Sequence, residues 1–496
     1  MARFSRSRHR AVRRLEYAVV RERGAYLGKG EPRCRSPLAM ATENQRPPTL
    51  PDDPLHDLRP HSSRAEQELV SRPRRSGIHP SGMTSSSRSQ GAIGETHDPR
   101  VRAFHEALAS FPAALFQFDP RMRDGWYTDR YFVRTARTIS LMGRDPVVSM
   151  QVFAKQAGVI AGVYEAIRML QTQLARHDGN NRSYSLGEFT IECLMDGDGV
   201  APYETAMLIT GPYLAYAHLE TDYLGVLARR SLVASNVRRV IDAANGKPVI
   251  FMGARHDDWR VQTPDGYAAR VGGAGSVSSD AGGAWWGASG VGTMPHAMIA
   301  AFRGDAIAAT LAFARYCRER EPAVKVVSLV DYHNDVIGDA LAIARAMREA
   351  YGVDSLAAVR VDTSESLVDR SLADVAAQHG AAGLTGVNPV LVQRLRDALD
   401  AADFPEVGII VSGGFTPAKI RQFERENVPV TGYGVGSSLL GHNDGMADGL
   451  LNDFDFTADV VRVDGRPESK VGRGLSPNPR LICLDLGLLE YVERSR

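Results

Sequence analysis

The chain has 496 residues, enough for two or three domains, and its 44% apolar and 24% charged residues are the balance of a globular protein. No uninterrupted run of about 18 apolar residues is present, and the net charge is only +1, so neither a membrane-spanning nor a nucleic-acid-binding protein is indicated. Four scattered cysteines, none in a Cys-x-x-Cys spacing, argue against a disulfide framework or a zinc cluster and suit a reduced, cytoplasmic protein.

The first 90 residues differ from the rest of the chain in charge. They hold 18 Lys and Arg against 9 Asp and Glu, and they are rich in Ser and Pro, as at residues 71–76. Little apolar periodicity is present, so the segment buries too little surface to offset the entropy lost on ordering. An organelle-targeting peptide is one interpretation. We expect instead a disordered extension over residues 1–95, with Met83 as a plausible true start.

Ordered sequence is expected from about Pro99, where an amphipathic pattern begins. Residues 130–230 mix strand-like alternation, as at residues 131–134, with helical stretches, as at residues 156–174. The sequence therefore predicts a mixed α/β region over these residues.

From about residue 247, short apolar runs alternate with helical segments, which is the βαβ pattern of a parallel sheet. Each run is compact, as a strand buried on both faces requires. The helical segments carry apolar residues three and four apart, as with Ile337, Leu341 and Ala344. The expected strands cover residues 248–252, 324–330, 356–361, 408–411 and 428–433. A long series of such units favours an α/β barrel over an open sheet.

Polar residues collect where these strands end, and in a parallel barrel the active site lies at those ends. Arg360 and Asp362 lie two apart on one strand end, so they point the same way. One cation and one carboxylate suit a phosphorylated sugar, with a structural ion pair at the rim as the alternative. Asp331, at the neighbouring strand end, is placed to hold a hydroxyl or a Mg²⁺ ion.

The last two strand ends are rich in glycine. Glycine lets the backbone come close to a ligand and aim several N–H groups at it. Thr416 is a good N-cap and Pro417 suits the first helical position, so a helix whose N-terminus favours an anion is expected there. Tight turns without a ligand are the alternative to a phosphate cradle. The expected cradle consists of Gly413, Gly414, Gly434 and Gly436.

His296 lies in the run Gly-Thr-Met-Pro-His-Ala at residues 292–297, after Gly and Ser clusters at residues 272–283. The clusters indicate a stretch that lines a ligand. A lone histidine is more often structural than catalytic, so the residue by itself leaves its role open.

In their order along the chain, these motifs resemble those of nicotinate phosphoribosyltransferases. The resemblance spans about residues 100–480 and implies an α/β N-terminal domain at residues 96–245 beside an irregular parallel α/β barrel at residues 246–445. Residues 446–496 would pack back on the N-terminal domain, and the family forms homodimers with shared active sites. The motifs that carry the resemblance are at residues 128–132, 253–256, 292–297, 360–363, 412–414, 434–437 and 470–473.

The resemblance also implies roles for residues that bind the pyridine. Asp129 and Tyr131 would reach into the partner's site, with Tyr131 stacking on the ring. Arg255 would bind on the pyridine or phosphate side of the pocket. Ser276 and Ser278 would lie near the carboxylate or amide of the substrate.

The remaining matches concern the sugar phosphate and its activation. His296 matches a histidine that many members phosphorylate with ATP, whereas Asp331, Arg360 and Asp362 would hold ribose and phosphate. Two positions depart from the family pattern: His256 stands where many members have a second arginine, and Met252 replaces a usual aromatic residue.

The function expected from the resemblance is the conversion of nicotinate and phosphoribosyl pyrophosphate to nicotinate mononucleotide and pyrophosphate, coupled to ATP and assisted by Mg²⁺, in NAD biosynthesis. The pyridine nitrogen carries no proton, so the lack of an obvious general base is consistent with this reaction. Nicotinamide and quinolinate are alternative substrates. A sugar-phosphate isomerase or aldolase would need a Lys or Glu base at a strand end, and a nucleotide-binding dimer without activity is the non-enzymatic alternative.

Overall fold

The computed structural model describes residues 99–175, 182–292, 294–441, 449–484 and 486. The extension expected over residues 1–95 lies outside the described residues. Within the described part, no helix is both long enough and apolar enough to span a membrane. Two six-stranded sheets organise this part of the chain.

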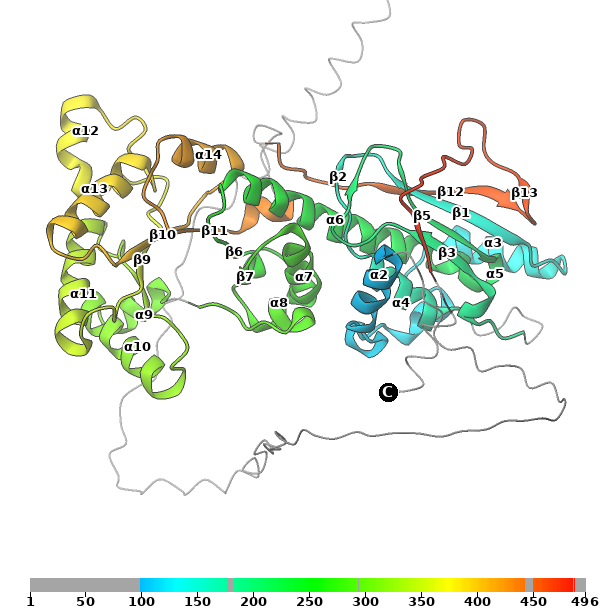
Figure 1. The fold of residues 1–496 in the computed structure, drawn as a ribbon, viewed down its shortest axis with the longest axis horizontal. Helices are drawn as coiled ribbons and strands as arrows, with labels where there is room; N and C mark the ends of the chain where they lie inside the picture. The colour runs from blue at the N-terminus through cyan, green and yellow to red at the C-terminus, as the bar shows by residue number, and fades with distance from the viewer. Residues whose placement is uncertain (1–98, 176–181, 293, 442–448, 485, 487–496) are drawn as a thin grey trace, which may run out of the picture. The chain divides into compact units, whose positions relative to one another are not determined.

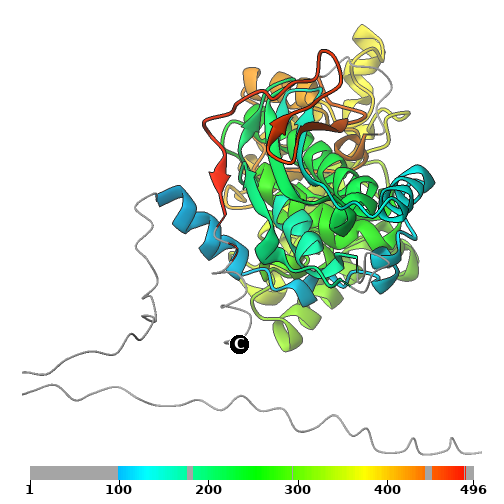
Figure 2. The same cartoon turned by 90° about the vertical axis from the view of Figure 1, so that its right-hand side faces the viewer.

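The first sheet is antiparallel and has the order β13-β12-β1-β5-β3-β14. Its central strands are long: β1 (Val147–Ala154), β5 (Thr205–Pro212) and β12 (Phe456–Val463). The shorter strands are β3 (Thr190–Cys193), β13 (Arg466–Pro467) and β14 (Ile482–Cys483). Strand β12 pairs with β1, and β14 pairs with β3, so C-terminal segments complete the N-terminal sheet, as expected. In Figures 1 and 2 these orange to red strands lie beside the cyan and green ones.

Two local expectations in this region need correction. The alternation at residues 131–134 is part of helix α3 (Arg130–Leu141), because a four-residue alternation is too short to separate a strand from an exposed helix. The helical pattern expected at residues 156–174 begins late: β2 (Gly158–Val159) pairs with β4 (Gly199–Val200), and α4 spans Val163–Gln173. Gly162, at φ +91°, separates the two elements.

The second sheet is parallel and has the order β7-β6-β11-β10-β9-β8. Its strands are β6 (Val249–Phe251), β7 (Ser276–Val277), β8 (Val327–Leu329), β9 (Ala358–Val361), β10 (Gly408–Val411) and β11 (Gly432–Val435). The five expected strands are present, although the last begins at Gly432 and so includes Gly434. Strand β7 escaped prediction because it contains only two residues, one of them serine.

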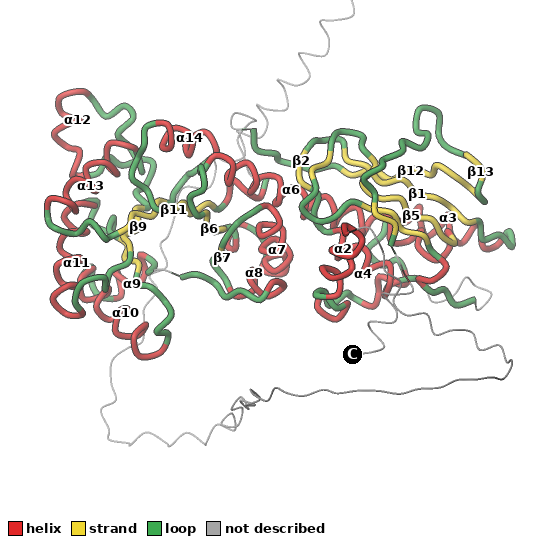
Figure 3. The backbone as a smooth tube through the Cα atoms, in the orientation of Figure 1, coloured by secondary structure: helices red, strands yellow, loops and turns green. Residues whose placement is uncertain are grey.

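This parallel sheet curls without closing. Strands β7 and β8 form its two edges, although they follow each other in the chain. The expected irregular barrel is therefore open between these two strands, and residues 278–326 connect them. Helices shown in red accompany the yellow strands in Figure 3.

Helix α6 (Glu220–Ala243) links two apolar cores. Tyr223 and Leu227, in its first half, belong to the core of the antiparallel region. Val237 and Val240, in its second half, belong to the core of the parallel sheet. At 1.5 Å per residue, a helix of this length is about 36 Å long, so one rigid element contributes to both cores.

The remaining α-helices connect and cover the strands. They are α2 (Pro99–Ala109), α5 (Tyr213–Tyr216), α7 (Gln262–Gly272), α8 (Asp280–Gly283), α9 (His296–Ala301), α10 (Ala306–Arg320), α11 (Val336–Tyr351), α12 (Ala373–His379), α13 (Pro389–Ala401) and α14 (Pro417–Arg425).

Candidate active site

A cleft of about 790 Å³ lies at the carboxyl ends of the parallel strands. This volume is in the range of small-molecule sites. Segments that follow β6, β7, β9, β10 and β11 all contribute to its wall, so residues far apart in sequence converge there. The wall includes Met252, Arg255, His256, Ser278, Met294, Arg360, Asp362, Glu365, Ser412, Gly413, Gly414, Thr416, Gly434 and Gly436.

Arg360, in β9, and Asp362, directly after β9, both line the cleft, as their two-residue spacing predicts. The hydroxyl of Ser412 donates to Oδ1 of Asp362 (2.9 Å), and Nη2 of Arg360 donates to the carbonyl of Met294 (3.4 Å). Burial lowers the pKa of Arg360, while Asp362 and Asp331 oppose that shift. A half-buried guanidinium beside carboxylates is well suited to pair with a phosphate group.

The loop after β10 forms one wall of the cleft. Gly413 and Gly414 have φ values of +87° and +62°, which side-chain-bearing residues rarely adopt. Oγ1 of Thr416 accepts from the backbone N–H of Lys419 (3.4 Å), so the expected cap is present and α14 begins at Pro417. The N-terminus of this helix and the loop therefore face the cleft with partial positive charge.

Gly434 and Gly436 also line the cleft, and their role in a phosphate cradle stays a prediction; each also makes room for a neighbouring side chain. A Cβ atom on Gly434 would lie 2.8 Å from Sδ of Met252, and one on Gly436 would lie 2.8 Å from Nε2 of His256. These glycines let the segment after β6 pack against β11. The two residues that depart from the family pattern are thus the ones that need this space.

Arg255 is exposed in the cleft wall, and its loop is anchored from behind. Nη2 of Arg229, on α6, donates to Asp257 in that loop (2.7 Å). The same guanidinium donates to both carboxylate oxygens of the buried Asp265 on α7 (3.1 and 2.7 Å). The ion pairs fix the loop of Arg255 to α6 and α7.

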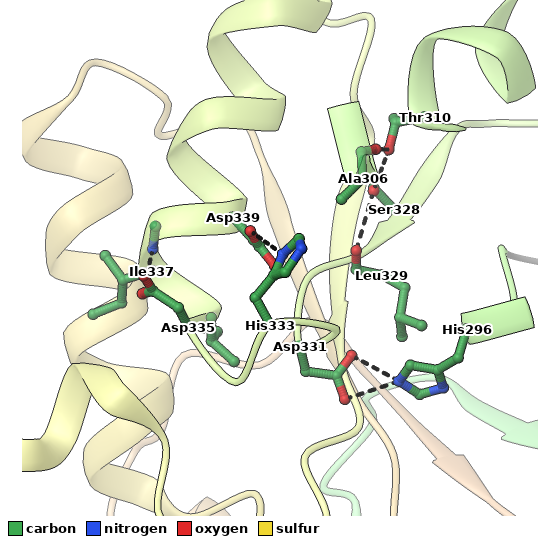
Figure 4. Close-up of polar contacts among 12 residues, drawn as sticks. His296, Ala306, Thr310, Ser328, Leu329, Asp331, His333, Asp335, Ile337 and Asp339 are labelled. Carbon is green, nitrogen blue, oxygen red and sulfur yellow. Dashed lines mark hydrogen bonds and ion pairs between the residues drawn. The ribbon is translucent and has the colours of Figure 1, made fainter. Parts of the chain in front are cut away.

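His296 is the first residue of α9 and pairs with Asp331 after β8. Its Nε2 lies 3.2 and 3.3 Å from the two carboxylate oxygens, and the second ring nitrogen points away from them (Figure 4). The side chain of Asp331 is 3% exposed, whereas that of His296 is 46% exposed. Burial raises the pKa of Asp331; the nearby histidine opposes this shift and Asp362 reinforces it.

A second histidine–aspartate pair lies in the same region. Nδ1 of His333 is 2.9 Å from Asp339, which is on α11 (Figure 4). Neither residue lines the cleft. Sequence reasoning did not single out this pair. His296 and Asp331 do not line the cleft either, but His296 directly follows the cleft residue Pro295.

Comparison with known proteins bears on this fold and its motifs. A family model described as quinolinate phosphoribosyl transferase, N-terminal domain, matches residues 129–231. The structure resembles nicotinate-nucleotide pyrophosphorylase from Pyrococcus furiosus, with a TM-score of 0.58 and 26% identity over 75% of this chain and 85% of that one. It shares its fold with human nicotinic acid phosphoribosyltransferase, with a TM-score of 0.51 and 18% identity over 70% and 77% of the two chains.

Two nicotinate phosphoribosyltransferases of Mycobacterium tuberculosis are similar in sequence. The one called pncB2 is 26% identical over 63% of this chain and 64% of its own length. The one called pncB1 is 27% identical over 56% and 55%. The chain therefore spans less than two thirds of the length of these relatives. The chain is thus similar in sequence to nicotinate phosphoribosyltransferases and in fold to enzymes of pyridine nucleotide synthesis.

Two residues implied by that family lie away from the cleft within one chain. Asp129 and Tyr131 are at the start of α3, and neither lines the cleft. The Tyr131 side chain is 58% exposed, and its hydroxyl donates to Oδ2 of Asp129 (3.3 Å). The hydroxyl of Thr221 donates to the same carboxylate oxygen (3.2 Å). Their expected action in a partner's site stays a prediction.

The two serines expected near the pyridine also separate. Ser278 lines the cleft, and its backbone N–H donates to the carbonyl of Phe251 (3.0 Å). Ser276 is in the edge strand β7 and does not line the cleft. Sequence reasoning missed Glu365, a cleft residue three positions after Asp362, although its place in a strand-end loop was a usable signal.

Proposed function

We propose that the chain is a nicotinate phosphoribosyltransferase, which transfers the phosphoribosyl group of phosphoribosyl pyrophosphate to nicotinate and releases pyrophosphate. The product, a pyridine mononucleotide, belongs to NAD biosynthesis. The observation that carries the proposal is the convergence of Arg360, Asp362 and the Gly413–Gly414 loop on one cleft, at the N-terminus of α14. Cation, carboxylate and partial positive charge there match the phosphate and hydroxyl groups of the donor.

The reaction suits this set of residues. The lone pair of the pyridine nitrogen forms a bond to the anomeric carbon of the ribose, and the carbon–oxygen bond to pyrophosphate breaks with its electron pair. The nitrogen carries no proton at neutral pH, so no general base is required. The task of the cleft is to orient the two substrates and to stabilise the charge that develops between them. Arg360 supplies a cation for the departing group.

Asp331 and Asp362 are the carboxylates that would hold a Mg²⁺ ion, a cation that prefers oxygen ligands. Burial raises the pKa of Asp331 and the charge of Asp362 adds to that shift, so a bound cation would relieve the repulsion between the two acids. No cluster of three or more His, Cys, Asp or Glu able to hold a metal is found among the described residues. A bound Mg²⁺ would supply charge neutralisation for the pyrophosphate.

ATP coupling is proposed to act through His296. With its Nε2–H donating to Asp331, the neutral imidazole has a lone pair on the other ring nitrogen. That nitrogen would attack the γ-phosphorus of ATP, form a nitrogen–phosphorus bond and release ADP. Water would later return the histidine and yield phosphate. The buried Asp331 is the group that orients the ring and stabilises its charged form.

A homodimer with shared sites is also part of the proposal. Tyr131 is exposed on α3, and Asp129 beside it is held by Thr221. An exposed aromatic ring next to a positioned carboxylate suits stacking on a pyridine bound by a partner copy.

Quinolinate is a second candidate substrate, favoured by the description of the family model that matches residues 129–231. A second ring carboxylate would need a further cation. Arg255 is the exposed cation of the cleft wall, and Ser278 offers a hydroxyl to one carboxylate. One cation and one hydroxyl suit the single carboxylate of nicotinate better than the two of quinolinate.

The test is pyrophosphate release by the purified full chain with phosphoribosyl pyrophosphate and Mg²⁺. Nicotinate, nicotinamide and quinolinate are offered separately, with and without ATP. Release with nicotinate that ATP increases is expected; release with quinolinate alone would reassign the substrate. Absence of release with all three would refute the proposal.

The histidine role needs a matched pair of variants. His296→Ala should abolish both the ATP stimulation and the acid-labile label from γ-labelled ATP. His333→Ala removes the other paired histidine outside the cleft, and it should retain both signals. Equal loss in the two variants would contradict the role assigned to His296.

A further inference from the structure

Glu365 is an acidic residue of the cleft wall to which the proposed reaction gives no role. It follows β9 in the loop after Asp362, it is exposed, and it lines the cleft together with the Gly413–Gly414 loop. It brings a negative charge to the wall that is expected to receive a phosphate. This placement requires an explanation of its own.

The backbone around Glu365 is held in place by a neighbouring loop. The N–H of Gly386 donates to the carbonyl of Leu367 (2.8 Å), and the N–H of Leu367 donates to the carbonyl of Ser364 (3.0 Å). Gly386 lies so close that a Cβ atom on it would be 3.1 Å from Cα of Glu365. The side chain of Glu365 therefore starts from a fixed point at the rim of the cleft.

From that point its carboxylate reaches the glycine loop. Oε1 of Glu365 lies 1.7 Å from the position that a Cβ atom on Gly414 would occupy. Oδ1 of Asp362 lies 3.1 Å from the corresponding position on Gly413. Each glycine of the loop thus has a carboxylate against it, and Glu365 fills the space directly over Gly414.

The electrostatic surroundings explain why a carboxylate is stable there. The loop leads into the N-terminus of α14, which favours negative charge. Nζ of Lys419 donates to the carbonyl of Gly413 (3.4 Å). Burial lowers the pKa of Lys419, and the negative charge of Glu365 opposes this shift, so the two side chains attract each other. A phosphate attracted to the same field would meet the charge of Glu365 at close range.

We infer that the Glu365 carboxylate is a built-in competitor for the anion cradle: it occupies the space over Gly414 when no phosphate is bound and moves aside when one binds. The identity of the competing ligand, the phosphate of a phosphoribosyl group, rests on the proposed function. Glu365 then sets the affinity for the phosphate rather than the rate of the transfer. Its side chain has the freedom to leave, because it is exposed and only its backbone is held.

Titration calorimetry with inorganic phosphate, and then with ribose 5-phosphate, tests this inference on the full chain. Glu365→Gln removes the charge and keeps the shape, and it should bind inorganic phosphate about fivefold more tightly than the wild type, the effect of one like charge at a partly exposed site. Glu365→Asp keeps the charge and should stay within about twofold of the wild type. Glu349→Gln, which removes an exposed charge on α11, is the matched control and should change nothing.

Unchanged or weaker phosphate binding in Glu365→Gln overturns the inference, as does tightening in Glu365→Asp equal to that in Glu365→Gln. Absence of phosphate binding in every variant overturns it as well. These results are separate from those for the reaction, because pyrophosphate release by the wild type is measured without reference to Glu365. A chain that turns over nicotinate while Glu365→Gln binds phosphate like the wild type retains the proposed function and loses only the competitor.

Discussion

The two six-stranded sheets of this chain use polar residues in opposite ways. In the antiparallel sheet, polar side chains form hydrogen bonds between neighbouring strands: Ser149 accepts from Thr210 (2.8 Å), and Gln151 accepts from Thr205 (3.1 Å). In the parallel sheet, polar residues lie at the strand ends: Arg360, near the carboxyl end of β9, and Asp362, just after β9, both line the cleft. The first arrangement stabilises a platform, and the second leaves charged groups available to a ligand.

Strand length underlies this difference. β1, β5 and β12 have eight residues each, whereas the parallel strands have two to four. In a short parallel strand, only a few buried apolar residues precede the loop at the strand's carboxyl end. Function in this chain should therefore depend on strand ends, and stability on strand interiors. Four predictions test that division, from the largest effect to the smallest.

Arg360→Met should lower kcat/KM for pyrophosphate release by about a thousandfold, since the substrate loses a half-buried cation in the proposed reaction. The midpoint of thermal unfolding should change little, because methionine replaces the aliphatic part of the side chain. Activity and thermal melting are measured on the same preparation. Retained activity with a large loss of stability would show that this strand-end residue serves stability and not function.

Ile209→Ala, in the interior of β5, should lower the free energy of unfolding by about 2–5 kcal/mol, because the residue is fully buried and a cavity remains. KM for both substrates should stay unchanged in the folded fraction. Denaturant titration gives the first quantity and steady-state kinetics the second. A changed KM would show that the platform also shapes the cleft.

Asp196 links the two regions, since its carboxylate accepts from the N–H of Val163 (2.7 Å) and the hydroxyl of Tyr267 on α7 (2.9 Å). Burial raises its pKa to about 6, above its ordinary value of 3.8. Folding therefore favours the protonated form, so the stabilising contribution is complete below about pH 4 and is lost as the pH rises through 6.

The free energy of unfolding of the wild type should accordingly fall between pH 4 and pH 6, by ~1–3 kcal/mol in all, and Asp196→Asn should show a weaker dependence. Chemical unfolding over this pH range is the measurement. A steeper dependence in Asp196→Asn would contradict the raised pKa.

Asp257→Asn should raise KM by about tenfold and leave kcat nearly unchanged, because it loosens the loop of Arg255 from Arg229 without touching the cleft. A double-mutant cycle with Arg229→Met is the control: the second substitution should add little to KM once the first is present. Additive effects on KM would show that the two residues act independently.

The parallel sheet could be predicted from the sequence because continuous apolar runs such as residues 408–411 have few other interpretations. Strand ends then located Arg360 and Asp362 by chain position alone. Strand β7 could not be found, since Ser276 and Val277 carry no pattern. Helix α3 was mistaken for a strand at residues 131–134 because its side chains are mostly exposed and lack a buried stripe.

Other parts of the site depend on contacts between distant loops. Nothing in the local sequence places Glu365 over Gly414 or the carbonyl of Met294 beside Arg360. Likewise, the sequence interprets Gly434 and Gly436 as part of a phosphate loop. Only the structure shows that Met252 and His256 pack against these glycines. The sequence identifies candidate site residues at strand ends, but it does not show which side chains of other loops contact them.

Because the parallel sheet is open between β7 and β8, the residues of the site are held in two different ways. Arg360, Asp362 and the glycine loops are held by strands inside the ladder, whereas His296 is carried by residues 278–326, which cross the opening. Insertions or deletions in that crossing change where the histidine stands without shifting the register of any strand pair. Under the proposed function, the residues for transfer and the residue for ATP coupling are therefore held by different parts of the fold, so a change in this connecting segment would alter the response to ATP before it altered the transfer.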